Sequence, residues 1–213
     1  MKLKINEIFY SIQGESSYAG TPCVFIRLTG CNLRCVWCDS EYSFYDGREI
    51  SLDEILTEIK KYNCNLIEVT GGEPLMQENC IELLQVLLSS EYQVMLETGG
   101  SLPVSAVPKG VIKIIDFKCP ESKMEKKNLW SILDDLDSKD EIKFVIGNRT
   151  DFDWAIDRVK EYNLTSKWTV LFSPVFDDLN YEDLVKWILE SKLPIRFQMQ
   201  MHKHIWEPET KGV

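Results

Sequence analysis

The sequence predicts an α/β fold, namely an abbreviated, incomplete (β/α) barrel with about six parallel core strands. Two observations carry this prediction. Short apolar runs rich in β-branched residues alternate along the chain with amphipathic helical patterns, which is typical of right-handed βαβ units and a parallel sheet. The chain has 213 residues, whereas a complete eight-unit barrel needs about 250. Residues 1–213 are therefore expected to form one domain with fewer units.

The expected strands are almost continuously apolar, as strands buried on both faces are. In chain order they are Cys23–Leu28, Leu66–Thr70, Tyr92–Leu96, Val111–Phe117, Ile142–Ile146, Trp168–Phe172 and Ile195–Met199.

Helices are expected where apolar residues recur at intervals of three and four. These stripes run from Leu52 to Ile59, from Ile81 to Leu88, from Phe152 to Val159 and from Leu184 to Leu189. Ser51 and Glu54 form a capping box that begins the first helix. The connection 97–109 is short and contains two prolines, which disfavours a full helix and leaves a doubly wound open sheet as the structural alternative.

Composition excludes several classes of protein. The net charge of −10 weighs against a general nucleic-acid binder, because phosphate backbones require clustered lysine and arginine. No apolar run approaches the ~20 residues that span a bilayer, and the N-terminus has no apolar signal segment. Seven cysteines, an odd number, argue against a disulfide framework and for a reducing compartment, so a cytoplasmic location without membrane partners is expected.

Polar residues follow several of the predicted strands directly. In a barrel, the chemistry is placed at the carboxyl ends of the strands, so these segments are expected to converge at one mouth. They are Thr29–Cys31, Gly71–Glu73, Glu97–Gly100, Asp116–Lys118, Ser173–Pro174, and Gln200 with His202.

Three cysteines lie within eight residues: Cys31, Cys35 and Cys38. A Cys-x3-Cys-x2-Cys loop can hold three corners of a 4Fe-4S cluster and leaves one iron open to another ligand. The alternative is a structural zinc site in a non-enzymatic module, which needs a fourth ligand from elsewhere in the chain.

This triplet, with Trp37 before its last cysteine, resembles the signature of radical S-adenosylmethionine (SAM) enzymes. In that family the open iron binds SAM, and one electron from the cluster cleaves SAM to a radical that abstracts hydrogen from substrate. The segment Thr70–Pro74 resembles the family's Gly-Gly-Glu-Pro motif, which meets the amino group of SAM. The resemblance implies a barrel of the radical SAM type.

Further segments resemble the 7-carboxy-7-deazaguanine synthase family over nearly the whole chain. They are Ile5–Ser16, Phe25–Leu33, Trp37–Ser40, Leu96–Gly100, Asp116–Pro120, Lys143–Ile146 and Gln200–Trp206. A glycyl-radical activase, the enzymatic alternative, shares the cluster motif but does not need Gln13–Glu15 or Asp39–Ser40.

This resemblance implies a lyase that converts 6-carboxy-5,6,7,8-tetrahydropterin to 7-carboxy-7-deazaguanine with loss of ammonia, in the biosynthesis of queuosine and related 7-deazapurines. It also implies that SAM acts as a regenerated cofactor, that Mg²⁺ assists, and that the enzyme is a homodimer. Its partners would be a small pterin substrate and an electron-donor protein such as flavodoxin or ferredoxin.

The resemblance also assigns residues. The expected SAM contacts are Trp37, Cys38, Asp39, Gly72, Glu73, Asp116, Phe117, Lys118 and Ser173. The expected substrate contacts are Ile12, Gln13, Gly14, Arg27, Thr70 and the terminal carboxylate of Val213. A guanidinium such as Arg27 suits the substrate carboxylate, and the Val213 carboxylate suits the amino and ring N–H groups of the pterin.

The chain departs from the family pattern at two positions. Ser40 stands where the family often has a threonine that binds Mg²⁺, and its hydroxyl is the same hard oxygen donor. Ser16 stands where the family often has glycine, which leaves the backbone shape of that loop open.

Overall fold

The computed structural model describes residues 1–213 and contains one curved, open sheet of nine strands. The strands are β1 (Lys2–Ile12), β2 (Pro22–Leu28), β3 (Arg48–Ser51), β4 (Leu66–Gly71), β5 (Gln93–Thr98), β6 (Ile112–Phe117), β7 (Glu141–Ile146), β8 (Thr169–Pro174) and β9 (Ile195–Phe197). Their order in the sheet is β3-β1-β2-β4-β5-β6-β7-β8-β9. Because β3 and β9 do not pair, the barrel is incomplete, as the sequence predicts.

Every pair from β2 to β9 is parallel, whereas β1 pairs antiparallel with both β2 and β3. The predicted apolar runs correspond to these parallel strands. The sequence analysis assigned no strand to residues 2–12 or 48–51, so β1 and β3 extend the predicted sheet at one edge.

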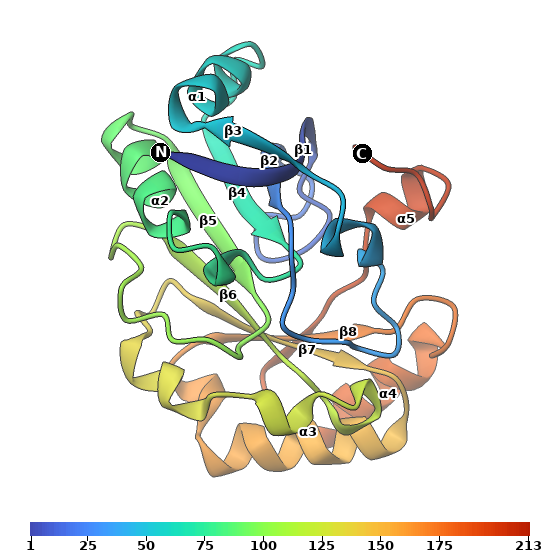
Figure 1. The fold of residues 1–213 in the computed structure, drawn as a ribbon. Coiled ribbons are helices and arrows are strands. Elements are labelled where there is room, and N and C mark those ends of the chain that lie inside the picture. Colours follow the sequence, from blue (N-terminus) through green and yellow to red (C-terminus); the bar gives the residue numbers. More distant parts are fainter.

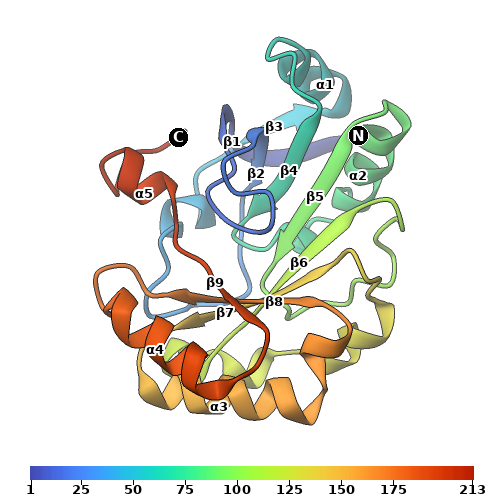
Figure 2. The ribbon, with the colours of Figure 1, turned by 180° about the vertical axis from the view of Figure 1, so that it is seen from behind.

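The four longer helices lie along the outside of the curved sheet, whereas a short fifth helix lies beside the C-terminus, away from the outer face (Figures 1 and 2). They are α1 (Leu52–Lys60), α2 (Cys80–Ser89), α3 (Arg149–Glu161), α4 (Tyr181–Ser191) and the short α5 (His202–Ile205). The capping box at Ser51 and Glu54 is present. The connection from β5 to β6 contains no helix, in agreement with its two prolines. None of the helices combines the length and apolar character that crossing a membrane requires.

Two groups of apolar side chains bury the two faces of the sheet. The larger has 38 buried residues and packs the helices against the outer face. The smaller lies on the inner face, at the bottom of the open barrel, and consists of Cys23, Phe25, Leu66, Met95, Ile112 and Ile114. This inner group closes one end of the barrel, so the space above it opens toward the carboxyl ends of the strands.

Candidate active site

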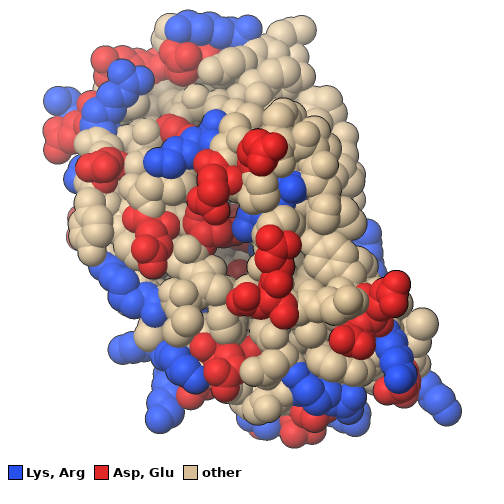
Figure 3. All heavy atoms as spheres, turned by 90° about the vertical axis from the view of Figure 1, so that its right-hand side faces the viewer, with Lys and Arg blue, Asp and Glu red and all other residues tan.

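A cavity of about 490 Å³ lies inside the open barrel at the carboxyl ends of the parallel strands. Figure 3 shows the molecule hollowed near the middle of one face, with acidic and basic side chains beside the hollow. Most residues that the sequence analysis selected line this cavity. They are Ile12, Gln13, Gly14, Arg27, Cys31, Cys35, Trp37, Cys38, Asp39, Ser40, Thr70, Gly72, Asp116, Lys118, Ser173 and Val213.

The cysteine loop between β2 and the short helix Glu41–Phe44 is fixed against the start of the next βα connection. The backbone N–H of Glu73 donates to the carbonyl of Gly30 over 2.8 Å. A side chain at position 72 would place its Cβ 2.6 Å from the Cβ of Cys31, so only glycine permits this approach. The Gly-Gly-Glu segment therefore positions the cysteine loop through the backbone.

The three loop thiols are free and partly exposed to the cavity. Burial raises the pKa of Cys31 and raises that of Cys35 to about 11, and the charge of Lys118 opposes the shift at Cys35. No three cysteine, histidine, aspartate or glutamate side chains gather closely enough to hold a single metal ion. Three soft donors on one loop that face a shared space fit an iron–sulfur cluster, which spreads its ligands over separate corners.

Asp116 and Lys118 form an ion pair beside these thiols. Lys118 Nζ lies 2.9 Å from Asp116 Oδ2, whereas Asp116 Oδ1 is buried with no hydrogen-bond partner. Burial by itself would lower the pKa of Lys118, but Asp116 and Cys35 raise it above its ordinary value. The orphaned oxygen and the cationic lysine offer one acceptor and one positive charge to a zwitterionic ligand such as SAM.

Two of the expected SAM contacts lie outside the cavity lining. The carboxylate of Glu73 is fully buried and accepts hydrogen bonds from the Thr98 hydroxyl, at 2.8 Å, and from the backbone N–H groups of Gly99 and Leu75. Both oxygens of this carboxylate accept hydrogen bonds within the protein, and these bonds join the turn after β4 to the end of β5.

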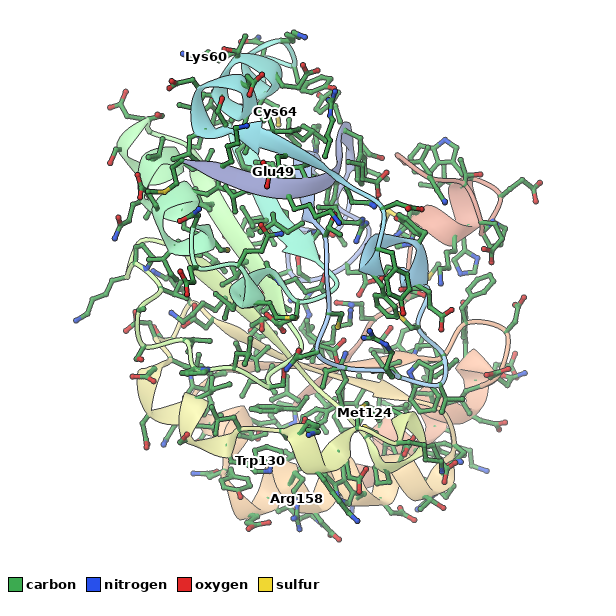
Figure 4. The ribbon with its side chains drawn as sticks, in the orientation of Figure 1. Glu49, Lys60, Cys64, Met124, Trp130 and Arg158 are labelled. Carbon is green, nitrogen blue, oxygen red and sulfur yellow. The ribbon has the colours of Figure 1, made fainter.

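The side chain of Phe117 points to the outer face of the sheet, away from the cavity. It is fully buried and stacks on Trp130 with ring centroids 4.3 Å apart. Figure 4 shows Trp130 on the helical side of the sheet. Because successive residues of a strand face opposite sides, Asp116 and Phe117 cannot both point into the barrel.

The sequence analysis missed a buried charge network on the inner face. Lys143 Nζ lies 2.9 Å from Glu97 Oε1 and 3.9 Å from Asp116 Oδ2, and it also contacts the carboxylate of Glu15. Although burial alone would lower the pKa of Lys143, these carboxylates raise it well above its ordinary value. A lysine with three carboxylates around it inside a cavity is a fixed cation that orients the acidic groups.

Glu68 was also missed. It lies on β4 in an otherwise apolar, completely buried strand and is 3% exposed. The amide of Gln13 donates to its carboxyl group. Burial, with the charges of Glu97 and Glu15, raises the pKa of Glu68 well above its ordinary value. The sequence signal that could have identified Glu68 is a glutamate in the middle of a mostly apolar strand. Glutamate is almost never fully buried unless it is paired.

Arg27 pairs with Glu7 of β1 at the edge of the cavity, and Tyr42 binds the same carboxylate. The Nε of Arg27 donates to Glu7 Oε1 over 2.7 Å, and the hydroxyl of Tyr42 donates to the same oxygen over 2.8 Å. The terminal nitrogens of the guanidinium remain free for an anion in the cavity.

The loop after β1 reaches across the gap in the barrel to the far edge of the sheet. Gln198 and Gln200, which follow β9, donate to the carboxylate of Glu15 over 2.9 and 3.0 Å. The backbone N–H of Met201 donates to the carbonyl of Gly14. Ser16 adopts φ = 61°, a left-handed conformation that glycine takes more readily than serine does.

The C-terminal tail covers the mouth of the cavity. Pro208–Val213 contribute to its lining, and the Lys211 ammonium lies 4.2 Å from the ring centre of Tyr42. His202 lines the cavity and packs on Gly14, whereas His204 contacts Tyr181 outside it. Both termini of the ribbon lie near β1, although on opposite sides of it (Figure 1).

Asp39 is tied to the segment that follows β9. Its carboxylate accepts from Gln200 over 2.9 Å and pairs with Lys203 over 3.1 Å. Desolvation by itself would raise the pKa of Asp39. The charge of Lys203 and the hydrogen bond from Gln200 instead hold this pKa well below its usual range. The end of the cysteine loop is thereby joined to the mouth of the cavity.

The chain resembles known proteins over nearly its whole length. The Radical SAM superfamily profile matches residues 25–119. The 7-carboxy-7-deazaguanine synthase of Koribacter versatilis is 46% identical over 226 residues, which cover 99% of this chain and 100% of that one. The enzyme of the same name from Chlorobaculum tepidum is 41% identical, with coverage of 99% and 97%.

Among solved structures, QueE from Escherichia coli superposes with a TM-score of 0.79 at 21% identity and covers 95% of each chain. Streptococcus suis SuiB bound to S-adenosylmethionine gives 0.53 at 13% identity and covers 80% of this chain and 45% of that one. These two likenesses support the incomplete barrel. With the cysteine loop in the cavity and near-complete alignment to curated relatives, the chain belongs to the 7-carboxy-7-deazaguanine synthase family of radical SAM enzymes.

Proposed function

We propose that this protein converts 6-carboxy-5,6,7,8-tetrahydropterin to 7-carboxy-7-deazaguanine and ammonia, as a step in queuosine biosynthesis. The observation that carries this proposal is the 46% identity over essentially the whole chain to an enzyme of that name. The full-length alignment favours this activity over that of a glycyl-radical activase. The substrate differs from the two products together by no atom and no electron, so no further oxidant is needed.

Cys31, Cys35 and Cys38 would hold the 4Fe-4S cluster, and Asp116 and Lys118 would meet SAM beside it. When bound, the two groups supply one-electron cleavage of SAM and hydrogen abstraction from substrate. The protein contributes position and exclusion of water, because the tail and the loop after β1 cover the cavity.

The pterin would occupy the β1 side of the cavity. Arg27 would hold the substrate carboxylate through its free terminal nitrogens, and Thr70 lies beside Arg27 in register on the neighbouring strand. Within Ile12–Gly14, the backbone N–H of Gly14 would meet the heterocycle. Both polar ends of the Gln13 side chain are engaged by Glu68 and by the N–H of Glu15, and the Gln13 backbone groups pair with Thr21 and Gly20.

Several further properties belong to the same proposal. Ser40 lines the cavity and offers a hydroxyl to Mg²⁺, which prefers oxygen ligands and shares them with substrate. A flavodoxin or ferredoxin would supply the electron, and the enzyme would act as a cytoplasmic homodimer.

The decisive experiment incubates anaerobically reconstituted protein with SAM, a reductant, Mg²⁺ and 6-carboxytetrahydropterin. The expected result is the appearance of 7-carboxy-7-deazaguanine with release of ammonia. A protein that carries a full cluster and cleaves SAM, yet leaves the pterin unchanged under these conditions, would contradict the proposal.

A further inference from the structure

Glu68 is an unusual residue at the floor of the cavity. It occupies the middle of β4, lines the cavity and is 3% exposed. The one hydrogen bond of its carboxyl group comes from the Gln13 amide and reaches Oε2. Its other oxygen, Oε1, receives no donor from the protein. A buried carboxyl group with a free oxygen is costly unless a ligand supplies the missing hydrogen bond.

A flat aromatic wall stands next to this carboxyl group. Phe25 is the register partner of Glu68 on β2, and its ring stacks on Phe9 with centroids 4.8 Å apart and planes 9° apart. Both rings line the cavity. Phe25 belongs to the small apolar group at the bottom of the barrel, and Phe9 packs against that group. An apolar, flat surface with one deep acceptor is suited to a planar heterocycle that carries N–H donors.

The position of Arg27 fixes the direction of such a ligand. Arg27 is the register partner of Thr70, two residues beyond Glu68 on β4, and lies one strand away. Two residues along a strand and one strand across correspond to about 8 Å between backbone positions. A bicyclic pterin spans a comparable distance between its carboxylate and its amino group. The distance between Arg27 and Glu68 thus matches the distance between the carboxylate and the amino group at opposite ends of the substrate.

We infer that Glu68 is the residue that recognises the aminopyrimidine end of the pterin, with its carboxylate accepting hydrogen bonds from the exocyclic amino group and the adjacent ring N–H. This inference rests on the proposed function and adds a specificity determinant to it. The amino group has two N–H bonds, so the Val213 carboxylate in the tail, next to Gly212 against Phe9, can share it from the other side.

A purely structural role for Glu68 predicts a different outcome. If Glu68 only held Gln13 in place, its replacement would weaken every pterin-like ligand equally. If it reads the amino group, replacement removes the preference for a ligand that has that group, because a site built to accept a donor rejects the analogue that lacks it.

The test compares 6-carboxypterin with 6-carboxylumazine, which has a carbonyl in place of the amino group. Isothermal titration calorimetry is performed anaerobically on the cluster-loaded protein with SAM present. The wild-type protein is expected to bind 6-carboxypterin at least tenfold more tightly. Glu68→Gln should reduce this preference to about twofold or reverse it, since its amide can donate to the carbonyl.

Glu141→Gln is the matched control. Glu141 is an equally buried strand glutamate that accepts from the backbone of Ser17 and does not line the cavity, so this variant should keep the wild-type preference. Glu68→Asp is a second variant that keeps the test valid if Glu68→Gln does not fold. It withdraws the carboxylate by one methylene and should lower the preference for 6-carboxypterin severalfold. Deletion of Gly212 and Val213 should weaken the binding of 6-carboxypterin more than that of 6-carboxylumazine, because it removes the second acceptor for the amino group.

The possible failures are distinguishable. Wild-type protein that binds neither compound contradicts the proposed function. Wild-type protein that prefers 6-carboxypterin, with the same preference retained in Glu68→Gln or in Glu68→Asp, overturns the assignment of Glu68 and leaves the proposed function standing. Uncoupled SAM cleavage by each variant reports that the cluster and its loop are intact.

Discussion

The carboxylate of Glu7 accepts a hydrogen bond from Arg27 Nε over 2.7 Å, which leaves the terminal nitrogens of this cavity-lining guanidinium outside the pair. Tyr42 fixes the other partner of this pair, because its hydroxyl donates to the same Glu7 oxygen. The ring of Tyr42 also contacts Lys211 of the tail. The group expected to bind the substrate carboxylate is therefore oriented from β1 and lies next to the segment that closes the site.

Glu7→Gln should raise the KM for the pterin about tenfold with little change in kcat, because a charge-assisted hydrogen bond that orients Arg27 is weakened by roughly 1.5 kcal/mol. Steady-state product formation measures this split. Glu49→Gln, an exposed glutamate on β3 (labelled in Figure 4), is the control and should leave both constants unchanged. A rise in KM that is accompanied by an equal loss of uncoupled SAM cleavage would show that Glu7 supports the fold instead.

Alanine at Cys31, Cys35 or Cys38 should abolish iron loading and all SAM cleavage, because each removes one of the three thiolates that an open cluster requires. Iron and sulfide analysis with the absorption near 400 nm measures the loss. Cys64→Ala is the control, since Cys64 lies away from the cavity and donates to the Pro22 carbonyl. A full cluster in Cys35→Ala would refute the assignment.

Deleting Gly212 and Val213 should raise the KM for the pterin at least fivefold and leave uncoupled SAM cleavage intact. Both residues line the cavity, whereas no residue of the tail is placed among the groups expected to meet the cluster. An unchanged KM would mean that the chain end has no part in substrate binding. Glu207→Gln, which keeps the chain length and is exposed outside the cavity, is a suitable control for altered charge in the tail.

The affinity for 6-carboxypterin should rise with pH. The raised pKa of Glu68 in the free protein means that its carboxyl group is protonated below that pKa, whereas the carboxylate is the form that accepts both ligand donors. Binding therefore releases a proton, and affinity increases with pH until the free-protein pKa is passed, then levels off. The groups that face Glu68 are Glu97, Glu15, Lys143, Arg27 and Cys23.

Calorimetry at several pH values in buffers of different ionisation enthalpy measures the proton released. Glu68→Gln should show a flatter profile, and any slope that remains belongs to the ligand or to the other facing groups. A slope that is identical in wild-type protein and in Glu68→Gln would show that Glu68 does not ionise on binding.

Ser16→Val should lower the free energy of unfolding by about 2 kcal/mol, because a β-branched residue cannot adopt φ = 61° without strain. Ser16→Gly should change it by less than about 0.5 kcal/mol, since the relief of strain is offset by greater freedom of the unfolded chain and by loss of the hydrogen bond that the Ser16 hydroxyl accepts from the N–H of Tyr18. Urea denaturation of the apoprotein measures both. Equal stability of the valine variant would contradict the left-handed conformation.

The parallel strands and helices were predictable from sequence because each has a strong apolar pattern. β1 and β3 were harder to find. β1 alternates clearly at Leu3 and Ile5, but its later residues are only half-buried along the open edge. A half-buried edge strand has neither the continuous apolar run of a central strand nor a full alternation, so local pattern does not separate it from a loop.

The site residues were predictable where a short motif surrounds them, as for the cysteine loop. The charged floor was not, because strands buried on both faces do not reveal which residues point inward. The alternation of side chains along a strand shows which residues point inward only when the orientation of one residue is already known. With Asp116 assigned inward, alternation assigns Ile114 inward and Phe117 outward. Glu68 and Lys143 then follow from register with their neighbouring strands.

The clamp between Glu15 and the glutamines that follow β9 also governs the order in which the protein can mature on the ribosome. The loop after β1 is among the first segments synthesised, yet its anchors at Gln198 and Gln200 are among the last. Translation proceeds at about 5–20 residues per second, and N-terminal parts fold first. The nascent chain thus carries its cysteine loop in a barrel that this clamp can close only when synthesis is nearly complete.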